Sequence, residues 1–137
     1  MVYFDTDVLI HFLTKQNDNL HTQANDIIEQ AILSNRFAIS WLSIQETGFV
    51  LAKLNQDSSF ISSTLKILSQ APPLQYGLAQ FNRAIQLAEI IGFKDFNDCR
   101  HTALAEQYCT DLYTCNYKDF TKLQPHTPLA IHFLKAV

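Results

Sequence analysis

The sequence predicts an α/β fold of three α/β/α layers, in which helices cover both faces of a central, short-stranded parallel sheet. Short β-prone runs alternate with longer segments whose apolar residues recur at helical spacing. Parallel strands need crossover connections, which are usually helical and right-handed, so this alternation indicates βαβ units. A length of 137 residues, of which 47% are hydrophobic and 17% charged, suits one globular domain over residues 1–137.

The first third of the chain contains two predicted strands and the helices between them. Residues 2–5 form an apolar, β-prone run that ends in an acid. Thr6 suits the N-cap of the next helix, whose apolar positions keep a helical period through residue 13. Residues 20–32 continue in helical spacing, and residues 37–39 form the second short strand.

The middle of the chain is mostly helical. Ser43 opens a helix that continues to Leu54, and a polar break separates it from another helix over residues 60–68. Two prolines at residues 72–73 end that helix, because proline lacks a backbone donor and clashes with the preceding turn. Residues 74–76 are a candidate for a brief strand.

The last third returns to alternating helices and strands. Gly92 ends an amphipathic helix, and either Asp95 or Asn97 caps the next helix, which contains Asp98. The amphipathic helix that Gly92 ends covers residues 81–91. Two further strands are predicted over residues 112–115 and 129–131.

Composition narrows the function classes. A net charge of −3 and a pI near 5.9 differ from the broad basic face of many nucleic-acid binders, so any such contact is expected to be local. No long uncharged apolar run or signal-peptide pattern is present, which predicts no membrane span. Three cysteines without metal or redox spacing favour reduced thiols and a cytoplasmic protein.

Acidic and amide residues follow the predicted strands. Asp5 ends the first strand, Glu46 lies about two helical turns after the second, and Asp98 opens a later helix, while Asn116 and Asp119 follow the third strand. In an open parallel sheet the ligand crevice lies beyond the carboxyl ends of the strands. Carboxylates gathered there repel each other by roughly 4 kcal/mol per pair at about 4 Å. A hard divalent ion such as Mg²⁺ would offset this repulsion and take oxygen ligands.

Each acid also has a purely structural interpretation. Asp5 can act as a helix N-cap. Ser43 and Glu46 have the spacing of a capping box, in which Glu46 bonds back to the backbone at Ser43. Asp98 can complement a helix dipole from the first turn. The joint placement of the acids after successive strands favours the metal site.

These residues resemble the PIN-domain nucleases, and among them the VapC-like toxins of toxin–antitoxin pairs. Residues 3–10 are similar to the family's first motif, a hydrophobic strand followed by an acid, Thr, Asn or Asp, and an aliphatic run. Ser40 followed by Glu46 resembles the second motif. Asp98, a helix of small and apolar residues, and then residues 112–120 keep the order and spacing of the third motif.

The resemblance implies a PIN-like fold and an endoribonuclease that cleaves RNA with Mg²⁺ or Mn²⁺. Asp5 and Asp98 would hold the metal, Glu46 would be a further ligand or position water, and Asn116 or Asp119 would help to orient the water. As a toxin, the protein would be inhibited by an antitoxin whose basic or apolar tail fills the acidic crevice. It would form a homodimer through the helices of its first half.

The sequence departs from the family at three positions. Many members have a fourth acid where this chain has Asn116, and Asp119 is the available substitute. The alternative function is therefore an RNA- or protein-binding module that has lost cleavage. Arg100 and His101 lie where the family's helix is often apolar, and none of the five histidines has the spacing of a metal-ligand pair.

Overall fold

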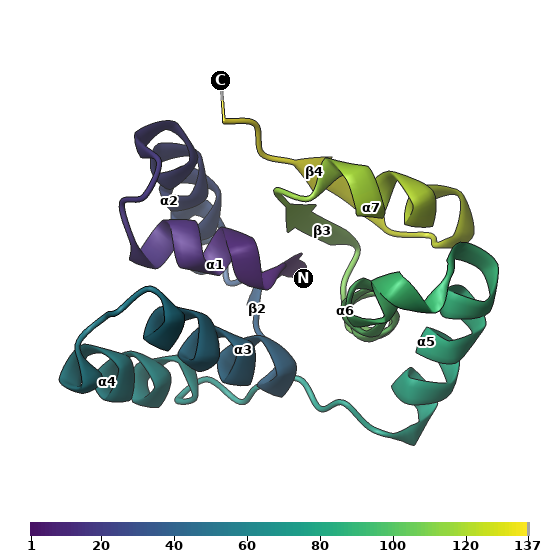
Figure 1. The fold of residues 1–137 in the computed structure, drawn as a ribbon, viewed down its shortest axis with the longest axis horizontal. Helices are drawn as coiled ribbons and strands as arrows, with labels where there is room; N and C mark the ends of the chain where they lie inside the picture. The colour runs from purple at the N-terminus through teal and green to yellow at the C-terminus, as the bar shows by residue number, and fades with distance from the viewer. Residues whose placement is uncertain (137) are drawn as a thin grey trace.

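The computed structural model describes residues 1–136, and its centre is a parallel sheet of four strands in the order β2-β1-β3-β4 (Figure 1). The register places Tyr3 of β1 opposite Ala38 of β2 and Leu112 of β3, and Leu112 opposite Ile131 of β4. The strands are β1 (Val2–Phe4), β2 (Phe37–Ala38), β3 (Asp111–Thr114) and β4 (Ala130–Phe133). The predicted parallel sheet is confirmed.

Seven α-helices connect and cover these strands among residues 1–136. None of the helices described is both long and apolar enough to span a membrane. The helices are α1 (Thr6–Leu13), α2 (Asp18–Leu33), α3 (Trp41–Lys53), α4 (Ser58–Leu68), α5 (Leu78–Ile91), α6 (Phe96–Tyr108) and α7 (Tyr117–Leu123), with 3₁₀ turns η1 (Phe93–Asp95) and η2 (Gln124–His126).

Alternate residues of the central strand enter two separate cores. Val2 and Phe4 pack with apolar residues of α1 and α2, whereas Tyr3 packs with residues of α5, α6 and α7. Successive side chains of a strand point to opposite faces, so each face of the sheet is covered by its own helices. Figure 1 shows α1 and α2 on one side of the strands and α5 and α6 on the other. The predicted three-layer α/β/α arrangement is confirmed.

The predictions that Thr6 caps α1 and that Ser43 opens α3 are both wrong. The N-cap of α1 is Asp5, whose carboxylate accepts a bond from the Thr6 N–H, while the Thr6 hydroxyl serves another partner. The N-cap of α3 is Ser40, whose hydroxyl oxygen accepts from the Ser43 N–H. Ser43 is buried against β1, so the helix has already begun at Trp41.

The structure also corrects the segments between the helices. Residues 74–76 form no strand, since only Leu74 bridges to Ser40. The helix α7 was not predicted, and Asn116 caps it by accepting a bond from the Asp119 N–H. Asp95 occupies the N-cap position of α6 after the turn η1, but its side chain makes no capping bond.

Candidate metal centre

A hollow of about 440 Å³ lies beyond the carboxyl ends of β1 and β3. Four of the five predicted site residues line it, and Asp119 is the exception. The location follows the rule for open parallel sheets, because the loops and helix starts after neighbouring strands meet there. The lining residues are Asp5, Thr6, Asp7, Ile10, His11, Gln16, Glu46, Phe49, Val50, Asn97, Asp98 and Asn116.

Asp5 is 7% exposed and is held by three bonds. Its backbone N–H donates to the Tyr113 carbonyl (2.9 Å), which ties the end of β1 to β3. The Thr6 N–H donates to Oδ1 (2.8 Å) and the Thr114 hydroxyl donates to Oδ2 (2.8 Å). Asp5 therefore caps α1 and also lines the hollow, so its structural role is compatible with a place in the candidate site.

Asp7 also lines the hollow, although it was not among the predicted site residues. The Cys115 N–H donates to both of its carboxylate oxygens (3.3 and 3.2 Å), and the Thr114 hydroxyl lies 3.4 Å from Oδ2. Burial and the nearby Asp5 charge raise the pKa of Asp7 well above its ordinary value despite these bonds. The available sequence signal was its spacing of two residues from Asp5 in the first helical turn.

Glu46 is not part of a capping box. The Thr6 hydroxyl donates to its Oε1 (2.7 Å), and His101 Nε2 lies 2.5 Å from the same oxygen, so the carboxylate bonds across three elements instead of back to Ser43. Burial raises the pKa of Glu46, but the bond and charge of His101, with Thr6, lower it to about 2. The carboxylate is ionised at neutral pH.

His101 was noted in the sequence as a departure from the family, but it was given no role in the site. It is fully buried, and Nδ1 lies 2.6 Å from the Tyr3 hydroxyl while Nε2 meets Glu46. Burial disfavours a charged imidazole, but Tyr3 and Glu46 outweigh it, and the pKa of His101 lies well above its ordinary value. The sequence signal was a polar residue at a position of α6 that faces the core.

Asp98 carries the least compensated charge in the hollow. It lies in the first turn of α6, and among residues 1–136 no hydrogen-bond donor reaches its carboxylate. Burial, then the charges of Asp5 and Asp119, raise its pKa to about 7, against the opposite effect of His101. An acid in the first turn interacts favourably with the helix dipole, but this interaction is weaker than the burial and repulsion that raise the pKa of Asp98. A carboxylate in such surroundings lacks a positive partner.

Asp119 belongs to a second acidic group that shares Asp98. Carboxylate oxygens of Asp95, Asp98 and Asp119 lie within 4.8 Å of one another, the only such convergence of acidic, His or Cys ligand atoms among the described residues. Asp5, Glu46 and Asp98 thus share the hollow without converging to that distance. Lys122 lies 3.1 Å from Asp95 and 3.5 Å from Asp119, and so offsets part of the charge.

Asn116 has a structural role in the arrangement. Its Oδ1 accepts from the Asp119 N–H (3.2 Å), and its Nδ2 donates to Asp119 Oδ2 (2.9 Å). This bond is the main cause that lowers the pKa of Asp119. The amide thus holds Asp119 in its ionised form on the side of Asp98.

The donor set fits a hard divalent cation. The hollow and the neighbouring acidic group present carboxylate oxygens, which Mg²⁺ and Mn²⁺ prefer. The nearby thiol of Cys115 is no competing ligand at neutral pH, because burial and the charge of Asp7 raise its pKa to about 12. The uncompensated charge of Asp98 is what a bound cation would neutralise.

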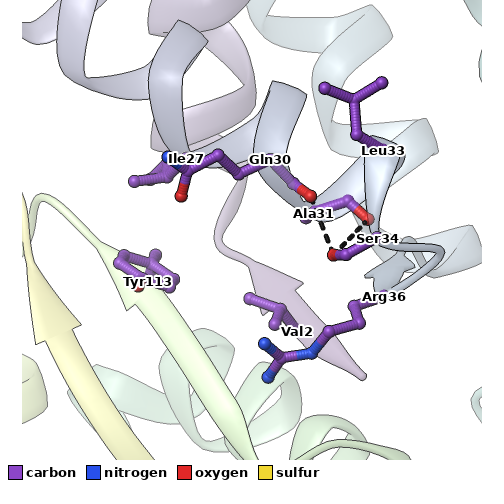
Figure 2. A pocket seen from close by; sticks show the side chains of 8 residues that line it. All are labelled: Val2, Ile27, Gln30, Ala31, Leu33, Ser34, Arg36 and Tyr113. Atoms are coloured by element: carbon purple, nitrogen blue, oxygen red, sulfur yellow. Dashed lines mark hydrogen bonds between the residues drawn. The ribbon is translucent and has the colours of Figure 1, made fainter.

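A second hollow, of about 490 Å³, lies at the other end of the sheet (Figure 2). Figure 2 shows Val2 and Arg36 near the start of the strands, beside the last turn of α2 and Tyr113 of β3. No carboxylate lines it, so it is a poor candidate for a cation. Its lining residues are Val2, Ile27, Gln30, Ala31, Leu33, Ser34, Arg36 and Tyr113.

Comparison with known proteins places the fold. Residues 2–124 match the family model of the PIN domain. A chain of VapBC2 from Rickettsia felis, solved bound to a DNA fragment from their promoter, is 18% identical with a TM-score of 0.68, and the match covers 98% of this chain and 100% of that one. A chain of FitAcB from Neisseria gonorrhoeae is 16% identical with a TM-score of 0.65, covering 96% of both chains. Among curated proteins, none matches the sequence.

A third solved structure, FitAB bound to an IR36 DNA fragment, contains a chain that is 15% identical with a TM-score of 0.66. That match covers 97% of this chain and 94% of the other. At these identities the solved structures establish a shared fold.

Proposed function

This chain belongs to the PIN-domain family, and from that premise we propose that it is a metal-dependent endoribonuclease, the toxin of a toxin–antitoxin pair. The observation that carries the proposal is that Asp5, Glu46 and Asp98 line one hollow at the carboxyl edge of the sheet, where burial and the charges of Asp5 and Asp119 raise the pKa of Asp98. The likeness of residues 3–10 and 112–120 to VapC-like toxins supports the toxin assignment.

Asp5 and Asp98 are the proposed holders of Mg²⁺ or Mn²⁺. Glu46 would contribute directly or through water, which Mg²⁺ retains in many protein sites. Asp119, held by Asn116, would serve the same ion or a second one through its group with Asp98. A bound ion would lower the pKa of a water molecule and neutralise charge that develops on the cleaved phosphodiester.

The proposed substrate is single-stranded RNA. Phe49 lines the hollow and is 64% exposed, and Lys53 Nζ lies 4.5 Å from the centre of its ring. Glu46, Phe49 and Lys53 recur every three or four residues on α3, so they share one helix face. An unstacked base can stack on an exposed aromatic ring while a lysine meets the neighbouring phosphate. This face would guide RNA toward the acids.

Two substitutions test the mechanism against a matched control. Asp5→Asn and Asp98→Asn should abolish Mg²⁺-dependent RNA cleavage while circular dichroism shows an unchanged fold. Asp111→Asn is the control, because Asp111 lies at the start of β3, bonds to His132 and does not line the hollow. Cleavage at the parent rate by both Asp5→Asn and Asp98→Asn would refute the proposal.

The second candidate function is a binding module without cleavage. It is favoured by Asn116, because this side chain caps α7, holds Asp119 and supplies no carboxylate of its own. A Mg²⁺ titration separates the two functions. Tight ion binding without a cleaved product on structured and unstructured RNA would favour the binding module.

The proposed partners are an antitoxin and a second copy of the chain. An antitoxin tail with a basic side chain would complement the acids of the hollow. Co-expression with the adjacent reading frame, followed by purification, tests the first partner. Size-exclusion chromatography with light scattering tests the homodimer. A cytoplasmic location stays a prediction.

A further inference from the structure

A buried hydrogen-bond chain stands directly behind the candidate metal centre. His101 of α6 bonds at one end to Glu46 of α3 and at the other to Tyr3 of β1. The Tyr3 hydroxyl also lies 2.8 Å from the Ser40 hydroxyl and 3.0 Å from the Ser43 hydroxyl. Three elements far apart in sequence therefore meet at one imidazole ring.

The position of His101 in the core requires an explanation. Most of its buried neighbours on α6 are small or apolar, and an aliphatic side chain there would avoid the cost of burying two polar nitrogen atoms. That cost is offset because each nitrogen of His101 has a partner. Asp98 precedes His101 by three residues, so α6 carries both on one face, with Asp98 in the hollow and His101 behind it.

The Glu46 carboxylate is held at one of its two oxygens. His101 Nε2 lies 2.5 Å from Glu46 Oε1, where a ring N–H donates and the carboxylate oxygen accepts. The Thr6 hydroxyl donates to the same oxygen. Both bonds therefore hold Oε1 from the protein side, and Oε2 is the oxygen not engaged by either of them. The side chain of Glu46 is 27% exposed, whereas the side chain of His101 is not exposed at all.

We propose that His101 is a positioning residue for the metal centre, which orients the Glu46 carboxylate so that Oε2 serves the divalent cation. The proposal rests on the function proposed above. His101 is not itself a ligand, since both ring nitrogens are occupied and the ring is fully buried. Tyr3 and the two serines hold the ring orientation, as outer partners do for metal-site residues in other proteins.

Two substitutions of His101 separate positioning from packing. The amide nitrogen of His101→Gln lies about where Nε2 does, so this variant keeps a donor for Glu46. His101→Asn places its amide near Nδ1 and is too short to reach Glu46. Both variants lose the ring, so a purely structural role would affect them alike. His132→Asn is the control, because it breaks the His132–Asp111 pair at the far end of the sheet.

The measurement is the dissociation constant of Mn²⁺ for the metal-free full chain, read from the spin-resonance signal of free Mn²⁺. We expect His101→Asn to weaken binding by about 10- to 100-fold, the range found for outer partners of metal ligands. His101→Gln should stay within about threefold of the parent, and His132→Asn should match it. In a Glu46→Gln background, His101→Asn should cause no further loss, because its effect runs through that carboxylate.

The outcomes distinguish the inference from the proposed function. A parent protein that binds no Mn²⁺ overturns both. Tight Mn²⁺ binding by the parent and unchanged binding by His101→Asn overturns the positioning role alone. If His101→Asn does not fold, Tyr3→Phe replaces it, since that variant removes only the hydroxyl that holds the ring. Weaker Mn²⁺ binding by Tyr3→Phe than by the parent would then support the positioning role, and unchanged Mn²⁺ affinity of Tyr3→Phe would overturn it.

Discussion

Asp98→Asn should make the metal-free protein more stable, although Asp98 is a proposed metal ligand. Burial and the charges of Asp5 and Asp119 raise the pKa of Asp98 to about 7 from an ordinary 3.8. Ionised Asp98 therefore destabilises the folded state above that pH. A neutral amide of nearly the same shape removes this repulsion.

The magnitude follows from the shift. A difference of about 3 pKa units corresponds to about 4 kcal/mol at pH 8, which is an upper limit because Asp98 retains some exposure to water. We expect about 2 kcal/mol, which for a chain of this size is a rise of roughly 5–10 °C in Tm.

The stabilising effect of Asp98→Asn should develop within a defined pH window. Between pH 4 and 7 the folded protein binds a proton at Asp98 that the unfolded chain has lost, so the parent loses stability as pH rises through this range. Below about pH 4 both states are protonated and the stabilities of the parent and Asp98→Asn should converge. Excess Mn²⁺ at pH 8 should make the parent more stable than Asp98→Asn. An ion concentration of about 100 times the dissociation constant adds about 2.7 kcal/mol to the stability of a protein that binds the ion.

Thermal unfolding followed by circular dichroism in chelator, at pH 4 and pH 8, measures the effect. If Asp98 only complements the helix dipole, Asp98→Asn should lower stability by about 0.3–1 kcal/mol at pH 8. A lower Tm for Asp98→Asn than for the parent at pH 8 would therefore refute the account of a strained acid cluster.

Three further predictions concern other residues of the site. Glu46→Gln should have the opposite effect to Asp98→Asn and destabilise the protein by about 2 kcal/mol at pH 7, because it leaves His101 buried without its carboxylate partner. A higher Tm for Glu46→Gln than for the parent would contradict a stabilising ion pair between Glu46 and His101. Since the pKa of Glu46 is lowered to about 2, its contribution should be present above pH 4.5 and disappear as pH falls toward 2, which acid titration of the Glu46→Gln and parent melts checks. Phe49→Ala should raise KM for RNA by roughly 5- to 100-fold, equivalent to one lost base stack, with kcat nearly unchanged and Tm within a few degrees of the parent. The control is Phe93→Ala, because the Phe93 ring has a similar exposure and does not line the hollow. Equal KM values for the two variants would show that Phe49 does not bind RNA.

Local sequence signals predicted most of the fold. The strand Val2–Phe4 lies within the predicted run 2–5, and Asp111–Thr114 begins one residue before the predicted run 112–115. The division of β1 between two cores was not visible in the sequence, because all three of its residues are apolar or aromatic and buried. The helix starts were less accurate, because Ser40 and Ser43 are equally good caps by type. Only the contact of Ser43 with Tyr3 shows which one lies inside the helix.

The candidate site was predicted in part. Asp5, Glu46, Asp98 and Asn116 were identified because each follows a strand or opens a helix near the carboxyl edge, and they line one hollow. Asp7 and Asp95 were not given weight. The sequence predicts Asp95 only as a possible helix cap. Its proximity to Asp119 comes from the packing of α6 against α7.

The sequence alone determined the parallel α/β class, the order of most of its elements and four of the residues that line the hollow at the sheet edge, because these depend on periodicity and on residues adjacent to strand ends. Only the tertiary structure decided what each acid bonds to. Glu46 pairs with His101, 55 residues away, and His101 meets Tyr3, 98 residues away. Burial and charge at such contacts lower the pKa of Glu46 and raise the pKa of Asp98, and neither burial nor a distant charge is a property of local sequence.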